Sequence, residues 1–127
     1  MHARNELSPL FGRGVHGTTF GGNHLACAAV EYILKELKKP SLSKNVSIVS
    51  DFIFERLRVM KAKYPLINEV RGMGLHIGIE LSVPGMDIVK KALLSGLIIN
   101  CTAEKVIRIM PPLTISMKTA RVFPLIS

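Results

Sequence analysis

Two stretches of helical periodicity follow one another in the first half of the chain. After Asn23, apolar residues recur every three or four positions until Lys-Lys-Pro at 38–40, and a second such pattern runs from about Ser43 to Tyr64. Asn23 suits the N-cap of the first helix because its side-chain oxygen can accept a hydrogen bond from a free helical N–H group. We expect two amphipathic helices whose apolar stripes belong to the core: Ala26, Val30, Ile33, Leu34 and Leu37 in the first, and Val46, Val49, Ile53, Leu57 and Met60 in the second.

A strand pattern follows these helices. Between residues 75 and 81, apolar side chains alternate with His76, Gly78 and Glu80, which is typical of a strand with one buried face. The Gly-Met-Gly sequence at 72–74 predicts a turn or a bulge in front of this strand.

The remaining predicted elements are shorter. Asp87 is expected to cap a helix that ends near Leu94, and Gly96 is well placed as its C-terminal stop. Residues 97–100 and 106–110 then predict two short strands. The order from residue 41 onward is helix, strand, helix, strand, strand. This order predicts an α+β fold in which helices cover one face of a short, mainly antiparallel sheet.

Length and composition indicate a globular chain. Its 127 residues suffice for a core, and 48% of them are hydrophobic while 20% are charged. No apolar run reaches the length of a membrane span and the first residues show no signal-peptide pattern, so we expect a soluble, cytoplasmic protein with no membrane partner. Cys27 and Cys101 have no second cysteine or paired histidine nearby at metal-binding spacing, which argues against a disulfide framework and a metal site.

The chain is basic, with 17 − 9 = 8 more Lys and Arg than Asp and Glu residues. Such a balance can attract nucleic acid, anionic membranes or anionic small molecules. The basic residues are dispersed, however, and many fall near the predicted C-terminal ends of helices, where the helix dipole favours cations. Few aromatic residues accompany them and no nucleic-acid-binding motif is present, so a nucleic-acid partner is not expected.

The sequence His-Gly-Thr-Thr-Phe-Gly-Gly-Asn at 16–23 is the best candidate for a binding site. It leads directly into the first predicted helix, whose N-terminus has free N–H groups and partial positive charge that stabilise phosphate and other anions. The glycines at 21 and 22 would let the backbone approach such an anion, and the hydroxyls of Thr18 and Thr19 could donate hydrogen bonds. The same residues are also typical of ordinary helix capping, so the stretch alone leaves both interpretations open.

Three segments in the same order resemble the class III pyridoxal-phosphate aminotransferases, and among them the acetylornithine and ornithine aminotransferases. They are 16–23 with the Leu-Ala-Cys-Ala-Ala that follows, Val-Arg-Gly-Met-Gly-Leu at 70–75, and 97–116, whose Asn-Cys-Thr-Ala is most similar to the acetylornithine branch. The resemblance implies the small C-terminal domain of fold-type I pyridoxal-phosphate transferases, or roughly the last third of such an enzyme. It divides the chain into an irregular end of the large domain, a linking helix and a small α+β domain, at 1–22, 23–39 and 40–127.

The resemblance implies roles for three residues of this chain. Thr19 would hydrogen-bond the phosphate of pyridoxal 5′-phosphate bound mainly by the other subunit of a homodimer, and Thr18 would face the substrate in that shared site. Arg108 would bind a substrate carboxylate or a neighbouring acid; a salt bridge to a core or surface acid is its alternative role. No catalytic residue and no metal ligand is expected here.

Lesser roles are expected for polar residues near the three segments. Arg71 is expected to tie the turn to an adjacent domain, and His16 to pack or to cap without a catalytic role. Asn100 and Thr102 are candidate substrate-loop residues. His24 stands where the family usually has proline, a residue that suits the first helical position.

The implied reaction moves the terminal amino group of acetylornithine to 2-oxoglutarate in arginine biosynthesis, with ornithine or another ω-amine as the nearest variant donor. Such an enzyme needs a lysine that holds the cofactor as a Schiff base, and no lysine of this chain lies in a matching context. The chain alone is therefore expected to be inactive and not to bind the cofactor covalently. A stand-alone, non-catalytic interaction module that keeps the fold is the alternative.

The C-terminal residues depart from the family pattern. After Ser116 the family generally continues into a closing amphipathic helix, whereas 117–127 are short and contain Pro124. If that helix is missing, part of an apolar face lacks its cover, and self-association is expected.

Overall fold

The computed structural model describes residue 6 and residues 17–121, and it divides the chain into two units, 1–37 and 38–127. The element order along the chain is α1, α2, β1, β2, α3, β3, β4 and α4. No helix in the described part of the chain is both long enough and apolar enough to cross a bilayer.

The first unit contains the helix α1 (His24–Leu37). Asn23 caps it as predicted, since its Oδ1 accepts a hydrogen bond from the Ala26 N–H over 2.9 Å. Glu31 and Lys35 pair over 2.6 Å on its surface. The prediction that its apolar stripe is core is wrong for this structure, because no residue of α1 is buried and Leu34 is 52% exposed.

The second unit begins with the long helix α2 (Pro40–Lys63). It starts before the predicted Ser43, because proline lacks an N–H group that the first helical position does not need, and Pro40 therefore opens this helix. Its C-cap is Tyr64, whose N–H donates to the Met60 carbonyl over 2.8 Å. The predicted apolar stripe is confirmed at the positions that are fully buried, Val49, Ile53 and Leu57.

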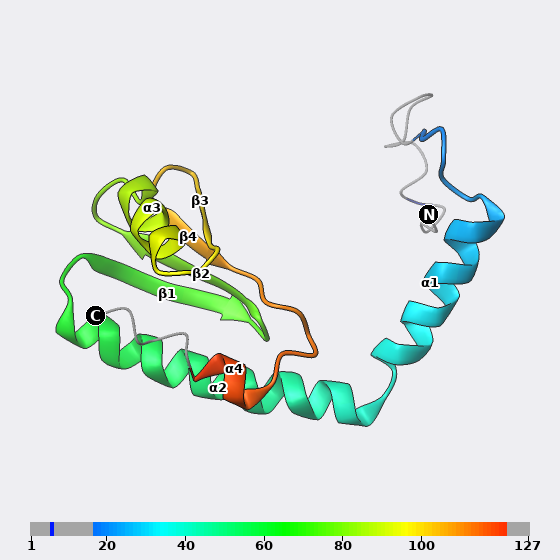
Figure 1. The fold of residues 1–127 in the computed structure, drawn as a ribbon, viewed down its shortest axis with the longest axis horizontal. Coiled ribbons are helices and arrows are strands. Elements are labelled where there is room, and N and C mark those ends of the chain that lie inside the picture. The colour runs from blue at the N-terminus through cyan, green and yellow to red at the C-terminus, as the bar shows by residue number, and fades with distance from the viewer. Residues whose placement is uncertain (1–5, 7–16, 122–127) are drawn as a thin grey trace. The chain divides into compact units, whose positions relative to one another are not determined.

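Four antiparallel strands form one sheet, in the order β1-β2-β4-β3 (Figure 1). Their bounds are β1 Ile67–Met73, β2 His76–Leu81, β3 Asn100–Thr102 and β4 Val106–Ile109. The α+β prediction and the strand at 75–81 are confirmed, but β1 was not predicted as a strand. Its alternation is hidden because the register shifts between Ile67 and Glu69, so that two neighbouring residues, Asn68 and Glu69, are exposed.

The β1–β2 hairpin closes through a two-residue loop, Gly74-Leu75, between the paired residues Met73 and His76. Gly74 has a φ of 56°, a left-handed value that glycine adopts without steric cost, and glycine at the first loop position is typical of tight hairpins. The predicted turn is therefore confirmed.

The helix α3 (Met86–Leu94) differs from its prediction at the N-terminus. Its N-cap is Gly85 without a side-chain hydrogen bond, whereas Asp87 lies in the first turn and pairs with Lys90 over 3.4 Å. An acid in the first turn is still favoured by the helix dipole. The predicted stop at Gly96 is confirmed, because its N–H donates to the Leu93 carbonyl over 3.0 Å.

The strand predicted at 97–100 is displaced, because β3 begins only at Asn100. Residues 97–99 form no ladder; Leu97 and Ile99 instead turn toward the core side, and Ile98 is 86% exposed. The last strand is confirmed, since β4 covers most of the predicted 106–110.

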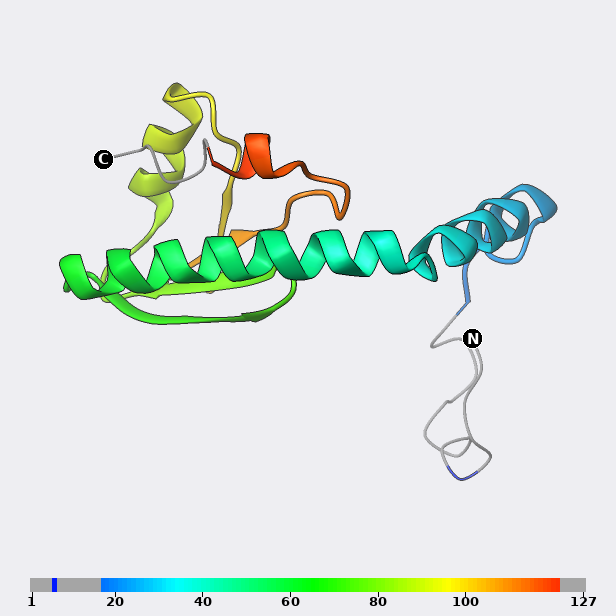
Figure 2. The same ribbon diagram turned by 90° about the horizontal axis from the view of Figure 1, so that it is seen from below.

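Helices α2 and α3 lie on the same face of the sheet, as predicted (Figures 1 and 2). The core lies between α2 and this face, and its largest fully buried side chains are Val49, Leu57 and Ile77. The opposite face carries the polar residues of the strands. A short helix α4 (Met117–Ala120), capped by Ser116, lies beside α2 and buries Ala120 completely.

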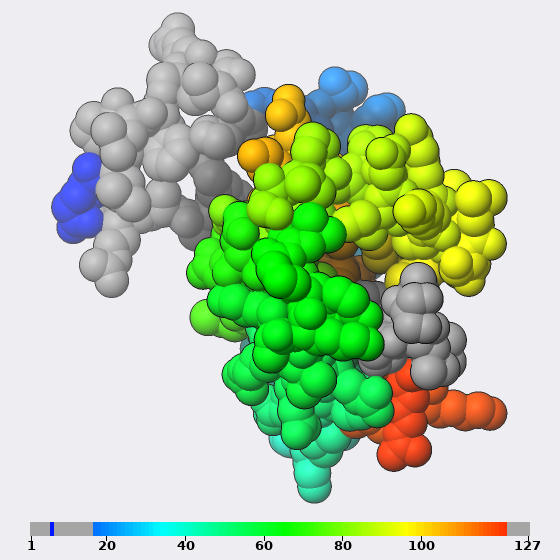
Figure 3. All heavy atoms as spheres, turned by 90° about the vertical axis from the view of Figure 1, so that its left-hand side faces the viewer, coloured from blue at the N-terminus to red at the C-terminus, as the bar shows by residue number. Residues whose placement is uncertain are grey.

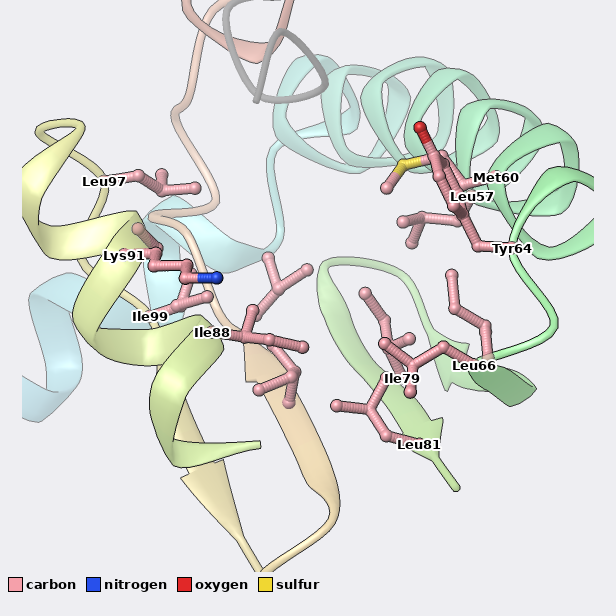
Figure 4. A pocket seen from close by; sticks show the side chains of 14 residues that line it. Leu57, Met60, Tyr64, Leu66, Ile79, Leu81, Ile88, Lys91, Leu97 and Ile99 are labelled. Atoms are coloured by element: carbon pink, nitrogen blue, oxygen red, sulfur yellow. The ribbon is translucent and has the colours of Figure 1, made fainter. Parts of the chain in front are cut away.

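A hollow of about 480 Å³ remains between the C-terminal half of α2 and α3. Figure 3 shows the second unit from the side on which the C-terminal part of α2 (green) and α3 (yellow) are both visible. Figure 4 shows the residues that line the hollow, with Leu57 and Met60 from α2 on one side and Ile88 and Lys91 from α3 on the other. Apart from Lys91 and Tyr64, all the residues that line this hollow are aliphatic or Met, so its surface is apolar. Residues 122–127, including Pro124, lie outside the described residues, and self-association stays a prediction.

Candidate functional site

The stretch 17–23 forms a tight turn that ends in the cap of α1. Gly22 has a φ of 77°, a value that favours glycine. At Gly21 a Cβ atom would lie 2.3 Å from Cγ2 of Thr18, so the Thr18 side chain would have to move to admit a side chain there. Asn23 closes the turn, because its Nδ2 donates to the Phe20 carbonyl.

The structure is therefore compatible with both interpretations of this stretch, helix capping and anion binding. The capping contacts of Asn23 are present, and Thr18 and Thr19 are exposed to solvent, as hydroxyls that bind an external anion need to be. His24 begins α1 although it lacks the fixed backbone angle of proline, so the helix start does not depend on proline here. His16 lies outside the described residues.

Arg108 lies on the polar face of the sheet, in the second unit. The strand registers pair Arg71 with Gly78, Gly78 with Arg108, and Arg108 with Asn100. Residues that pair across antiparallel strands share one face, so these four residues form one row across the whole sheet. Two guanidinium groups thus stand on either side of a glycine.

The positive charge of Arg71 is balanced by two carboxylates of the same face. Its Nη1 donates hydrogen bonds to the carboxylates of Glu80, on β2, and Glu69, on β1, the latter over 2.6 Å. These two hydrogen bonds, that of Glu80 first, raise the pKa of Arg71 above its ordinary value, so Arg71 stays charged. The tie of Arg71 to an adjacent domain stays a prediction, because these contacts lie within its own sheet.

Arg108 has a different environment. Its Nε donates to Oδ1 of Asn100 over 3.2 Å, and within the described residues no carboxylate pairs with it. Its side chain is only partly exposed, since it lies between Asn100 and Gly78. The alternative of a salt bridge to an acid of the described chain is not what the structure shows. The outer nitrogens of the guanidinium are left for a carboxylate, whose two oxygens match their geometry.

Asn100 and Thr102, the candidate substrate-loop residues, both belong to β3 and both are exposed. The turn that follows contains Ala103 and Glu104, which have φ values of 48° and 60°. It is fixed by the Gly85 N–H, which donates to the Glu104 carbonyl over 2.8 Å. Asn100, at the start of β3, accepts a hydrogen bond from Arg108 and can orient its guanidinium group.

Sequence reasoning did not identify Gly78, Glu69 or Glu80 as parts of this site. The alternation around Gly78 predicted that it faces away from the core, which is correct. Its position beside both arginines depends on pairing with β1 and β4, however, and β1 had not been assigned as a strand. Strand register was the missing information.

A family model, "Aminotransferase class-III", matches residues 1–123 of the chain. The chain therefore belongs to the class III aminotransferases. It is 41% identical over 117 residues to the acetylornithine aminotransferase of Clostridium acetobutylicum, covering 91% of this chain and 30% of that protein. It is also 41% identical over 112 residues to the acetylornithine aminotransferase of Methanocaldococcus jannaschii, covering 88% of this chain and 28% of that protein.

Solved structures of similar proteins agree with this assignment. Ornithine delta-aminotransferase of Plasmodium falciparum matches with a TM-score of 0.78 and 30% identity, covering 96% of this chain and 33% of that one. Acetylornithine aminotransferase of Elizabethkingia anophelis matches with a TM-score of 0.76 and 28% identity, covering 94% of this chain and 33% of that one. The fold is that of fold-type I pyridoxal-phosphate aminotransferases, and the chain spans about a third of the length of these relatives.

Proposed function

We propose that this chain supplies the C-terminal part of a pyridoxal-phosphate-dependent aminotransferase that acts on acetylornithine and 2-oxoglutarate in arginine biosynthesis. The observation that carries this proposal is Arg108, a partly exposed arginine that is oriented by Asn100 and has no carboxylate partner within the described residues. The acetylornithine aminotransferases to which the chain is 41% identical support the choice of donor. Ornithine is the nearest variant donor, because ornithine aminotransferases share the fold.

The turn at 17–23 fits the phosphate of pyridoxal phosphate. The two exposed hydroxyls and the start of α1 can both donate hydrogen bonds to a dianion. The glycines leave the backbone of the turn without side chains, and no acidic side chain among residues 17–23 would repel the anion. Thr19 would donate to the phosphate, and Thr18 would contact the substrate. The cofactor, when bound, supplies the chemistry that takes the amino group from the donor and gives it to the keto acid.

Arg108 binds and orients a substrate in this proposal. A carboxylate of 2-oxoglutarate or of the amino donor accepts hydrogen bonds from its outer nitrogens, while Asn100 holds the Nε side of the guanidinium in place. Orientation of this kind lowers the entropic cost of reaching a reactive geometry.

The site is completed by another part of the enzyme. We propose that the cofactor is bound mainly by the other subunit of a homodimer, and that the lysine that binds it covalently lies in a segment corresponding to the part of the relatives that this chain does not span. The chain alone is then inactive. We also propose a cytoplasmic location, with which the two free cysteines agree.

Two experiments test this proposal, the first with the purified chain and the second with a fusion protein. Incubation with pyridoxal phosphate, reduction with borohydride and peptide mapping are expected to give no stoichiometric lysine adduct and no turnover. Fusion of the chain to the clostridial relative, in place of the segment that it matches, is expected to give acetylornithine:2-oxoglutarate transamination. A specific lysine adduct with turnover would contradict the proposed division of labour, and a folded, dimeric but inactive fusion would favour the non-catalytic interaction module.

A further inference from the structure

We infer that Gly78 determines which ligands reach Arg108: the absence of a side chain at its position opens the polar face of the sheet to a carboxylate. This inference rests on the proposed role of Arg108. The first observation is the register, which places Gly78 directly between Arg71 and Arg108 on one face. A side chain at position 78 would stand beside the guanidinium of Arg108, because cross-strand neighbours lie about 5 Å apart at Cβ.

The fold itself does not require glycine at this position. Gly78 is not among the residues with positive φ, so its backbone suits any residue. A Cβ atom there would lie 3.4 Å from Cγ1 of Val106 and 3.8 Å from the Arg71 carbonyl oxygen, which are ordinary contacts. Glycine inside a strand weakens it and is typical of places where a ligand comes close to the backbone.

The charges of the residues on either side of Gly78 favour an anionic ligand that binds toward Arg108. Arg71 is already paired with Glu80 and Glu69, whereas the one hydrogen bond that the Arg108 side chain makes within the described residues goes to the neutral Asn100. A carboxylate that lies over Gly78 therefore finds free guanidinium donors on the Arg108 side and a neutralised pair on the Arg71 side. A group that is both flat and short suits this position, and small dicarboxylates and amino acids carry such a group.

The test is a titration of the full chain with glutarate, a dicarboxylate that cannot be transaminated. The side-chain Nε–Hε resonance of Arg108 in ¹H–¹⁵N spectra reports binding without any need for the cofactor. We expect a saturable shift in the wild-type chain, about a tenfold weaker affinity in Gly78→Val and a smaller loss in Gly78→Ala, because blocking the approach removes a charge-assisted hydrogen bond.

The controls separate this inference from the proposed function. Met73→Val introduces the same side chain on β1 outside the row, and it should bind glutarate as the wild type does. Backbone spectra identify any variant that fails to fold. If Gly78→Val does not fold, the glutarate affinity of Gly78→Ala tests the inference, because the structure accommodates alanine at this position. Wild-type affinity in a folded Gly78→Val or an unchanged Gly78→Ala would overturn the inference alone. Absence of a saturable shift in the wild type, or an unchanged affinity in Arg108→Gln, would overturn the proposed role of Arg108.

Discussion

The hydroxyl of Ser50 donates a hydrogen bond to the carbonyl of Gly74 over 2.8 Å, which joins the middle of α2 to the loop of the β1–β2 hairpin. Ser50 is only 7% exposed, so water cannot easily replace this contact. We expect Ser50→Ala to lower the free energy of unfolding by about 1–3 kcal/mol, because the Gly74 carbonyl loses its partner. Urea unfolding measures this loss, with the exposed Ser47→Ala as its control. Equal midpoints for the two variants would contradict the importance of this contact.

Ile77 is fully buried at the centre of the sheet, facing α2. Ile77→Ala should destabilise the chain by about 2–5 kcal/mol, since it removes apolar contacts and leaves a cavity. Ile98 is 86% exposed, so Ile98→Ala is a control with the same change of side chain. Thermal unfolding of both variants checks the position of the core. A similar loss in both would mean that Ile98 is covered by a contact that this structure does not contain.

Thr19 and Thr18 are predicted to have separable effects in the active fusion described above. Thr19→Val removes a donor to the phosphate and should weaken pyridoxal phosphate binding by about tenfold. Thr18→Val should instead raise the KM for the amino donor with little effect on cofactor affinity. Cofactor titration followed by absorbance and steady-state kinetics separate the two. Equal cofactor affinity in Thr19→Val and the parent fusion would remove Thr19 from the proposed phosphate site.

Arg71 is predicted to keep Glu80 away from Arg108. Glu80 lies on the same face and only two residues from Gly78, and its carboxylate is held by Arg71. We expect Arg71→Ala to free Glu80 for Arg108 and to weaken glutarate binding by about two- to fivefold, the strength of an exposed ion pair. Adding Glu80→Gln to Arg71→Ala should restore the affinity. If the single variant already binds like the wild type, Arg71 has only a structural role.

Sequence patterns were sufficient for elements whose periodicity is regular and whose ends carry strong signals. The α2 stripe, the alternation in β2, the Asn23 cap and the Gly96 stop all belong to this group. Their structure depends on neighbours within a few residues along the chain. Local physics therefore sufficed to predict them.

The errors concern relations between distant residues. The bulge after Ile67 hid β1, and without β1 the row of Arg71, Gly78 and Arg108 could not be recognised. The stripe of α1 looks like a core stripe because its pattern is amphipathic, but what covers such a stripe is decided by tertiary contacts. Arg108 was identified from its charge within an apolar strand, whereas the absence of a carboxylate partner for it among the described residues could be seen only in three dimensions.

The most direct test of the account is the kcat/KM for 2-oxoglutarate of the active fusion with Arg108→Gln. Lys105→Gln removes one positive charge from an exposed position in the same hairpin and is the matched control. We predict that Arg108→Gln lowers kcat/KM by about 10- to 100-fold, the loss expected when a charged hydrogen-bonding partner of a carboxylate is removed, while Lys105→Gln stays near the parent value. An Arg108→Gln fusion with the kcat/KM of its parent would contradict the claim that this chain binds the carboxylate of the substrate.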